Sequence, residues 1–208
     1  RTAPANRLAK EAAAAIRTRP SHPMASPPRF YPKRIRHLSN PTRAAPSLHP
    51  MPFQSRSVQL NKQPFEALQF TEGRVESLFH LLDELDPPYA IPPGELSIAF
   101  LGDEAIGQLH GEFLDDPTPT DVITFEGEPE LDFAGEICVS VEHALSQSAQ
   151  FGTTFAEELT LYLIHGWLHL AGFDDLTEAA CPAMRAGERH LMELLKSQEA
   201  IPDFSIAS

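Results

Sequence analysis

Apolar residues recur along this chain with two spacings, one helical and one alternating. In Thr71–Asp86 they lie three or four residues apart, the spacing of one face of an α-helix, at Val75, Leu78, Phe79, Leu82 and Leu85. Pro87 and Pro88 follow and end this helix. Glu95–Leu101 instead alternates and is rich in strand-forming residues, so it predicts a β-strand.

The same two patterns predict the remaining elements. We expect helices over residues 103–114, 142–151, 155–171 and 178–196, and strands over residues 57–60, 121–125 and 136–141. Thr154 and Glu157 have the spacing of a capping box at the start of the third of these helices. The acidic segment 126–135 is expected to be an exposed connection between two strands. This order of elements predicts an α+β fold, with helices set around a small mixed sheet.

Charge divides the chain into two parts. Residues 1–50 contain ten Lys or Arg residues and one acidic residue, Glu11, whereas residues 51–208 contain six basic and 28 acidic residues. The first part is also rich in proline, so we expect residues 1–50 to be a disordered or non-native extension. An organelle transit peptide and a true start at Met51 or Met24 both remain open. We expect the folded domain at residues 51–200 and a short tail at residues 201–208.

Composition narrows the class of protein further. The chain of 208 residues is 42% hydrophobic, which is enough for a core, and no apolar run approaches the length of a membrane span. Cys138 and Cys181 are the only cysteines, so a dense disulfide framework is excluded. We therefore expect a cytoplasmic protein with no membrane partner, or an organellar one if residues 1–50 are a genuine transit peptide.

Two histidines in an apolar helix carry the strongest chemical signal. His165 and His169 are four residues apart, which places both imidazoles on one face of the helix, one turn apart. Gly172 can adopt the left-handed conformation that ends a helix, and Asp175 can then fold back toward the same face. Two His and a third ligand surround three sides of a Zn²⁺ ion and leave the fourth position for water. Such a bound water indicates hydrolysis.

The alternative interpretation of this pair is two hydrogen-bonded core histidines. Without strong partners, however, two imidazoles would be costly among the apolar neighbours Leu161, Leu163, Ile164, Leu168 and Leu170. Gly172 and Asp175 also stand at fixed offsets that suit a third ligand, so a metal site is favoured. His190 is the spare ligand if Asp175 does not bind.

With these residues in view, the chain resembles the YbeY family of single-strand-specific endoribonucleases. His165–Asp174 match the first ten positions of the family motif H-G-x-L-H-L-x-G-[YF]-D-H. Pro119–Val122 resembles the family's P-T-D-V loop, and Gly135–Ile137 resembles its G-[DE]-I strand. Glu158 matches a family Glu seven residues before the first His. The resemblance covers about residues 55–197.

The resemblance implies a fold, a cofactor and a substrate. It implies an α+β fold with a four-stranded sheet packed with about five helices, and one Zn²⁺ ion on a central helix. It also implies cleavage of single-stranded RNA in rRNA processing, at the 16S rRNA 3′ end, on the small ribosomal subunit. Ribosome biogenesis and quality control are the implied cellular setting.

The chain departs from the family pattern at two positions. Asp175 replaces the family's third His; a carboxylate can bind zinc, but its charge weakens the metal as a Lewis acid, so we expect slower or more alkaline-shifted hydrolysis. Leu114 replaces an Arg, which would be a clamp for the scissile phosphate.

Six basic and 28 acidic residues also give residues 51–208 a net charge of −22. RNA binding then needs either a ribosomal protein partner or one shared face for Arg56, Lys62, Arg74, Arg185 and Arg189.

A hydrolase of this kind also needs a general base. Gly166 occupies the position at which metalloproteases carry a Glu, so the candidates are Glu136 on a neighbouring strand and Glu158 on the metal helix. Solvation, capping or orientation of a metal ligand are the alternative roles for both.

Three functions therefore remain open. The first is a zinc-dependent endoribonuclease. The second is a zinc peptidase, which the spacing H-x3-H-x5-D allows and Gly166 opposes. The third is a ribosome-assembly factor with little or no nuclease activity, which Leu114 and the acidic charge favour.

Overall fold

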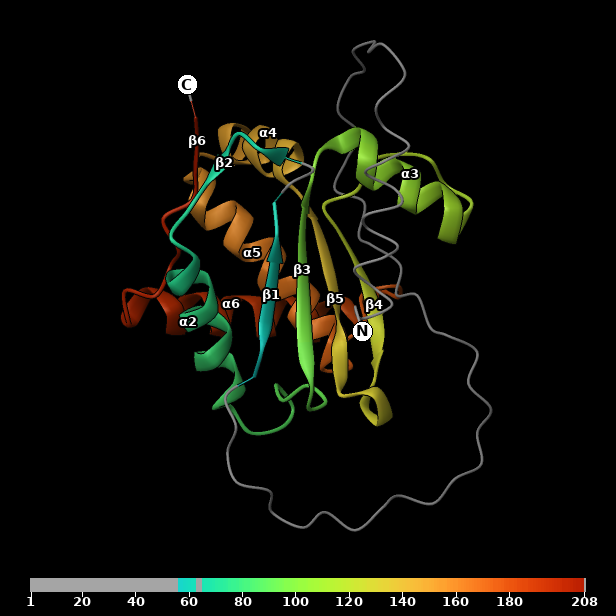
Figure 1. The fold of residues 1–208 in the computed structure, drawn as a ribbon, viewed down its shortest axis with the longest axis vertical. Helices are drawn as coiled ribbons and strands as arrows, with labels where there is room; N and C mark the ends of the chain where they lie inside the picture. The colour runs from blue at the N-terminus through green and yellow to red at the C-terminus, as the bar shows by residue number, and fades with distance from the viewer. Residues whose placement is uncertain (1–55, 63–64, 208) are drawn as a thin grey trace.

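The computed structural model describes residues 56–62 and 65–207 (Figure 1). The helices are α2 (Glu72–Asp83), α3 (Asp103–Leu114), α4 (Val141–Phe151), α5 (Phe155–Leu170) and α6 (Cys181–Ser197), with a short 3₁₀ helix, η3 (Pro129–Leu131). The strands are β1 (Val58–Asn61), β2 (Leu68–Gln69), β3 (Glu95–Leu101), β4 (Val122–Glu128), β5 (Phe133–Ser140) and β6 (Ser205–Ile206). The predicted extension at residues 1–50 lies outside the described residues and stays a prediction.

Four strands form one mixed sheet in the order β1-β3-β5-β4. β3 is parallel to both β1 and β5, with Ile98 beside Leu60 on one side and Ile137 on the other. β4 is antiparallel to β5 and forms the edge. Within the described part of the chain, five α-helices surround this sheet, which confirms the predicted α+β class.

The β4–β5 hairpin is longer than the sequence pattern predicts. Glu128 pairs with Phe133, and Glu126 pairs with Gly135, so strand pairing continues almost to the tip. Asp132 takes a left-handed conformation there, with φ 57°. Phe133 and Ala134 are buried. The exposed connection predicted over residues 126–135 is therefore wrong at residues 133–135, because antiparallel pairing draws them into the sheet, whereas residues 128–132 are exposed.

α5 is the central helix of the domain. Apart from Leu161, every residue from Glu158 to Leu170 is buried. The predicted capping box is present at its start: Glu157 N donates to Thr154 Oγ1 (3.2 Å), and Thr154 N donates to Glu157 Oε2 (3.1 Å). Although α5 is apolar, none of the helices in residues 56–62 and 65–207 has the length and apolarity to span a membrane.

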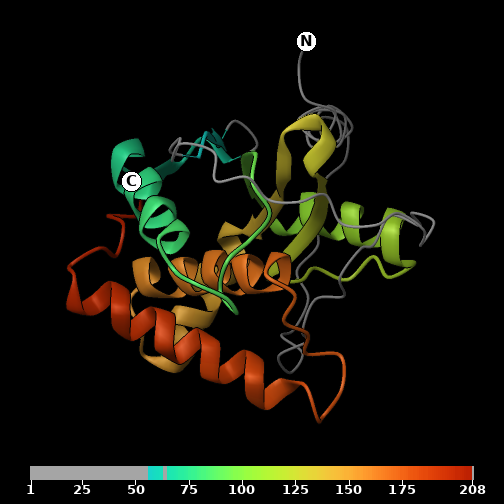
Figure 2. The same cartoon turned by 90° about the horizontal axis from the view of Figure 1, so that it is seen from below.

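A glycine lets α5 lie directly on the sheet. A Cβ on Gly166 would be 2.4 Å from Ile137 Cγ2 and 3.2 Å from Val122 Cγ2, so no larger residue fits without displacing the helix or the sheet. Ile137 and Val122 thus belong to what we call the α5 face of the sheet. α6 runs beside α5 on this side (Figure 2).

The opposite surface of the sheet, which we call the α3 face, packs on α3. Successive side chains of a strand point to opposite faces, so Ile123 and Cys138 point away from α5. Both lie in a separate apolar cluster with Ile106 and Leu109 of α3. The sheet therefore separates two buried layers, and only one of them contains α5.

The last residues of the chain pack on the domain. β6 pairs with β2, and Phe204 is buried. The Asp203 carboxylate accepts hydrogen bonds from Thr71 N (2.9 Å) and Thr71 Oγ1 (2.7 Å), immediately before α2. The segment predicted as a tail at residues 201–208 is thus in contact with the rest of the fold over its described part.

Candidate metal centre

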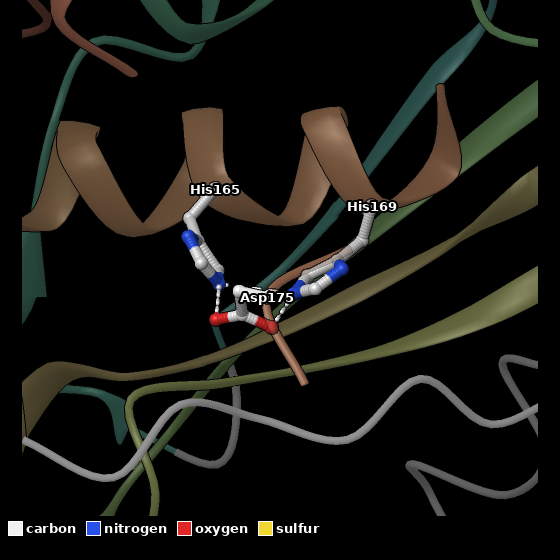
Figure 3. Close-up of side chains that lie close together, drawn as sticks. All are labelled: His165, His169 and Asp175. Carbon is white, nitrogen blue, oxygen red and sulfur yellow. Dashed lines mark hydrogen bonds and ion pairs between the residues drawn. The ribbon is translucent and has the colours of Figure 1, made fainter. Parts of the chain in front are cut away.

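His165 and His169 point toward the same place beside α5 (Figure 3). They lie one turn apart on the helix, as the spacing predicts. Their Nε2 atoms are 2.9 Å apart, and the residues are only 3% and 1% exposed. Two ring nitrogens therefore converge in a buried space.

Asp175 completes the cluster from the turn after α5. Gly172, with φ 99°, lets the chain reverse, and Phe173 N donates to Leu168 O (2.9 Å) as the helix ends. The Asp175 carboxylate then lies with Oδ2 3.5 Å from His165 Nε2 and Oδ1 3.7 Å from His169 Nε2. The fold thus brings together the three residues predicted as metal ligands, with one ligand atom of each within 4.8 Å of the others.

The outer nitrogens of both imidazoles have acceptors. His165 Nδ1 lies 2.6 Å from Glu188 Oε1, and His169 Nδ1 lies 3.2 Å from the backbone oxygen of Phe173. These acceptors assign the proton of each neutral ring to Nδ1. Each Nε2 then presents a lone pair to the centre of the cluster, which is the tautomer that a metal ligand requires.

The Asp175 carboxylate supplies the test of whether a cation fits. Both of its oxygens are buried, and neither has a hydrogen-bond donor within the described part of the chain. With the Nε2 atoms of His165 and His169, four acceptor atoms face one another, and one shared proton could satisfy only one pair of them. A buried carboxylate without a donor is costly, so a cation at the centre of these atoms relieves the cost. Imidazole and carboxylate ligands suit Zn²⁺ and other divalent transition metals.

Negative charge accumulates around this cluster. Burial lowers the pKa of His165, but the hydrogen bond with Glu188 and the charges of Asp121, Glu188 and Asp175 outweigh it, so the pKa is raised. Burial raises the pKa of Asp175 from its ordinary 3.8 to about 6; His165 opposes this rise, and Asp121, Asp174 and Glu188 add to it. Several carboxylates therefore compete for positive charge at one place, as expected where a cation binds.

Glu136, a predicted general base, lies on the other side of the sheet. Its neighbour Ile137 contacts α5, so the Glu136 side chain points to the α3 face. There it is 1% exposed and accepts a hydrogen bond from Ser97 Oγ (3.0 Å). Burial raises its pKa to about 7, and the Ser97 hydrogen bond lowers it in part. The fold does not bring Glu136 to the cluster of His165, His169 and Asp175.

Glu158, the second predicted base, lies near the start of α5. It is buried, and Thr153 Oγ1 donates to its Oε2 (3.1 Å). Seven residues of helix place it about 10 Å along the axis from His165. His190, the predicted spare ligand, is exposed, and its ring stacks on Tyr89 with centroids 5.3 Å apart.

Glu188 also belongs to this cluster, although the sequence pattern was not interpreted as placing it there. It comes from α6, 23 residues after His165, and makes the shortest contact of the cluster. A signal was present: Met184, Glu188, Leu191 and Leu195 share one face of α6, and the other three are buried apolar residues. A glutamate on an apolar stripe indicates a buried partner.

Comparisons with known proteins identify the family of this chain. A family model described as Endoribonuclease YbeY matches residues 58–196. Endoribonuclease YbeY of Geobacillus thermodenitrificans is 31% identical over 140 residues, which are 61% of this chain and 90% of that protein. Endoribonuclease YbeY of Exiguobacterium sp. is 34% identical over 113 residues, 48% of this chain and 72% of that protein. A solution structure from Thermotoga maritima, TM1509, aligns with a TM-score of 0.48 and 25% identity, over 69% of this chain and 92% of that one.

The proteins from Geobacillus and Exiguobacterium are named endoribonucleases, which are hydrolases that act on RNA. Their names agree with the predicted class of enzyme. The family model covers about two thirds of the chain, over nearly the range that the sequence motifs suggested. The protein from Geobacillus is matched over most of its own length. The chain belongs to the endoribonuclease YbeY family.

Proposed function

We propose that this chain is a zinc-dependent endoribonuclease that cleaves single-stranded RNA. The observation that carries the proposal is the convergence of two Nε2 lone pairs and the Asp175 carboxylate, whose oxygens have no donor among the described residues. Membership of a family of endoribonucleases supports the choice of substrate. Processing of 16S rRNA at its 3′ end, on the small ribosomal subunit in the cytoplasm, belongs to the same proposal.

His165, His169 and Asp175 would hold the metal, which would supply a water of lowered pKa and polarise a phosphoryl oxygen. Glu188 keeps the His165 proton on Nδ1, and the Phe173 carbonyl does the same for His169. Asp175 adds a negative charge that a third His would not have, so this centre should activate water less strongly than one with three neutral ligands.

For the general base, Asp121 is a better candidate than Glu136 or Glu158. Its charge acts on both His165 and Asp175. Its Oδ1 accepts hydrogen bonds from Thr120 Oγ1 and Val122 N, both at 3.0 Å, which orients the carboxylate.

A zinc peptidase is the less favoured function. Peptidases with two helical His ligands carry a Glu directly after the first His. In this chain that position is Gly166, and its Cβ direction meets Ile137 in the sheet rather than the metal cluster. A ribosome-assembly factor without nuclease activity is the stronger alternative, since Leu114 and the acidic domain both oppose RNA binding.

The deciding experiment measures zinc content and RNA cleavage together, on the chain and on its Asp175→Ala and Asp175→His variants. We expect one zinc per parent chain, cleavage of a single-stranded oligonucleotide, loss of both with Ala, and faster cleavage with His. Zinc without RNA cleavage, in the parent and in Asp175→His, would instead favour the assembly factor. Cleavage of a denatured protein would favour the peptidase.

A further inference from the structure

The domain has few cations with which to bind RNA. After residue 50 there are only Arg56, Lys62, Arg74, Arg185, Arg189 and Lys196. Arg56 binds the Asp83 carboxylate with two nitrogens, at 2.7–2.9 Å, and Gly94 O at 2.7 Å. Arg74 donates to the backbone oxygen of Ile201 (2.9 Å). These two guanidinium groups therefore have partners within the fold, and their contacts stabilise it.

Lys62 and Lys196 contact other parts of the domain. The Lys62 ammonium lies over the Phe70 ring, 5.1 Å from its centroid. Lys196 Nζ lies 2.6 Å from Glu157 Oε1. Lys196 stands 15 residues after the start of α6, about 22 Å along that helix. Neither ammonium belongs to the end of α6 that borders the metal cluster.

One edge of α6 does face the metal cluster. Cys181 Sγ donates to the backbone oxygen of Asp175 (3.1 Å), and Glu188 accepts from His165 Nδ1 (2.6 Å). Arg185 is four residues after Cys181 and three before Glu188, and such positions are neighbours on a helix surface. Arg185 therefore stands on the edge of α6 that both contacts define. Unlike Asp175 and His165, it is exposed.

We infer that Arg185 binds a phosphate of the RNA strand at the edge of the metal cluster. This inference rests on the proposed function. A guanidinium can bind a phosphate through two parallel hydrogen bonds, and it offsets the repulsion that Asp175 and Glu188 exert on a polyanion. It also supplies, from a different helix, a cation that Leu114 does not provide.

Arg189 offers a matched control. It has the same charge on the same helix and is also exposed, but it follows Glu188 directly. Arg189 is four residues after Arg185, so it lies on the same side of α6 but about one turn farther from the Asp175 turn. Replacement of either arginine removes one positive charge, so a general charge effect would be equal in the two variants.

The experiment compares the full chain with Arg185→Gln, Arg185→Lys and Arg189→Gln. Binding of a fluorescent single-stranded RNA is followed by anisotropy over a range of salt concentrations, and the RNA length is checked on a gel after each titration. For Arg185→Gln we expect a Kd about tenfold higher, from loss of one charge-assisted contact. The slope of log K against log salt should fall in magnitude by about 0.7, the value for one phosphate of a single strand.

The other measurements separate a phosphate contact from a structural role. Arg185→Lys should keep the parent's salt slope, and Arg189→Gln should keep both slope and Kd. In cleavage assays, Arg185→Gln should raise KM with little change in kcat, and its zinc content and Tm should equal those of the parent. Equal effects of Arg185→Gln and Arg189→Gln on RNA binding would overturn the inference about Arg185. Cleavage of RNA by the parent chain would still support the proposed function in that case. A parent chain that neither binds nor cleaves RNA would overturn both.

Discussion

The α3 face and the α5 face of the sheet each bury an acidic residue, but in different surroundings. On the α3 face, Glu136 accepts a hydrogen bond from Ser97, and its pKa is raised to about 7. On the α5 face, neither oxygen of Asp175 has a donor among the described residues, and both face the Nε2 atoms of His165 and His169. One proton makes Glu136 neutral, whereas one proton cannot satisfy all the acceptors around Asp175.

This difference shows how two buried carboxylates can be told apart. Burial alone raises the pKa of either group and says nothing about function. The arrangement of neighbouring lone pairs is what distinguishes a candidate metal centre from a protonated residue of the interior. The following predictions test that distinction.

The largest effect is expected from His165→Ala. Loss of a residue that only supports a metal ligand weakens metal binding by up to about 100-fold. Loss of one of three protein ligands should therefore weaken zinc binding by more than this, and it should abolish RNA cleavage. Zinc affinity is measured by competition with a chromophoric chelator. Glu136→Gln is the matched control on the α3 face and should bind zinc like the parent. Equal zinc loss in both variants would contradict the distinction between the faces.

Glu136→Gln should change the pH dependence of stability. Folding raises the pKa of Glu136 from 4.5 to about 7, so the folded protein favours the protonated carboxyl. The stability that this group contributes is therefore fully present below pH 4.5 and is lost as the pH rises to 7. Gln is neutral throughout and can still accept from Ser97. The variant should therefore gain stability relative to the parent between pH 4.5 and 7, by up to about 3 kcal/mol above pH 7.

Urea unfolding of the parent and Glu136→Gln at pH 5, 6, 7 and 8 measures this gain. The difference between the two proteins removes pH effects that both share. Two stability curves that run parallel over this range would show that Glu136 ionises in the folded protein as easily as in the unfolded chain.

Glu188→Gln tests the support of the metal cluster rather than a ligand. The amide oxygen can still accept from His165 Nδ1, but the negative charge that strengthens this contact is lost. We expect zinc affinity to fall by about tenfold, and by up to about 100-fold in Glu188→Ala. Chelator competition measures both variants. Unchanged affinity in Glu188→Ala would show that His165 is oriented by its packing alone.

The smallest effect is expected from Thr154→Ala at the start of α5. Removal of the capping hydroxyl should lower the free energy of unfolding by about 1 kcal/mol, because Glu157 N loses its acceptor. Urea unfolding measures this change. Zinc affinity should stay at the parent value, since the cap lies about three turns from His165. A parallel loss of zinc would mean that the metal cluster depends on the whole length of α5.

The local features of the candidate metal centre followed from the sequence alone. The interval between His165 and His169, the reversal at Gly172 and the capping box before α5 depend on residues within a few positions of one another. Helix periodicity and turn conformation act over that range, so the pattern was sufficient. The same holds for β3, whose predicted bounds agree with Glu95–Leu101 in the structure.

Only the tertiary structure decided which distant residues take part. Alternation along β5 indicates that Glu136 and Ile137 face opposite ways, but not which of the two faces α5 covers. The contact of Glu188 with His165 arises because α6 turns back along α5, and it joins residues 23 positions apart. Such contacts follow from the packing of whole elements, which depends on side chains throughout the core and on no local spacing.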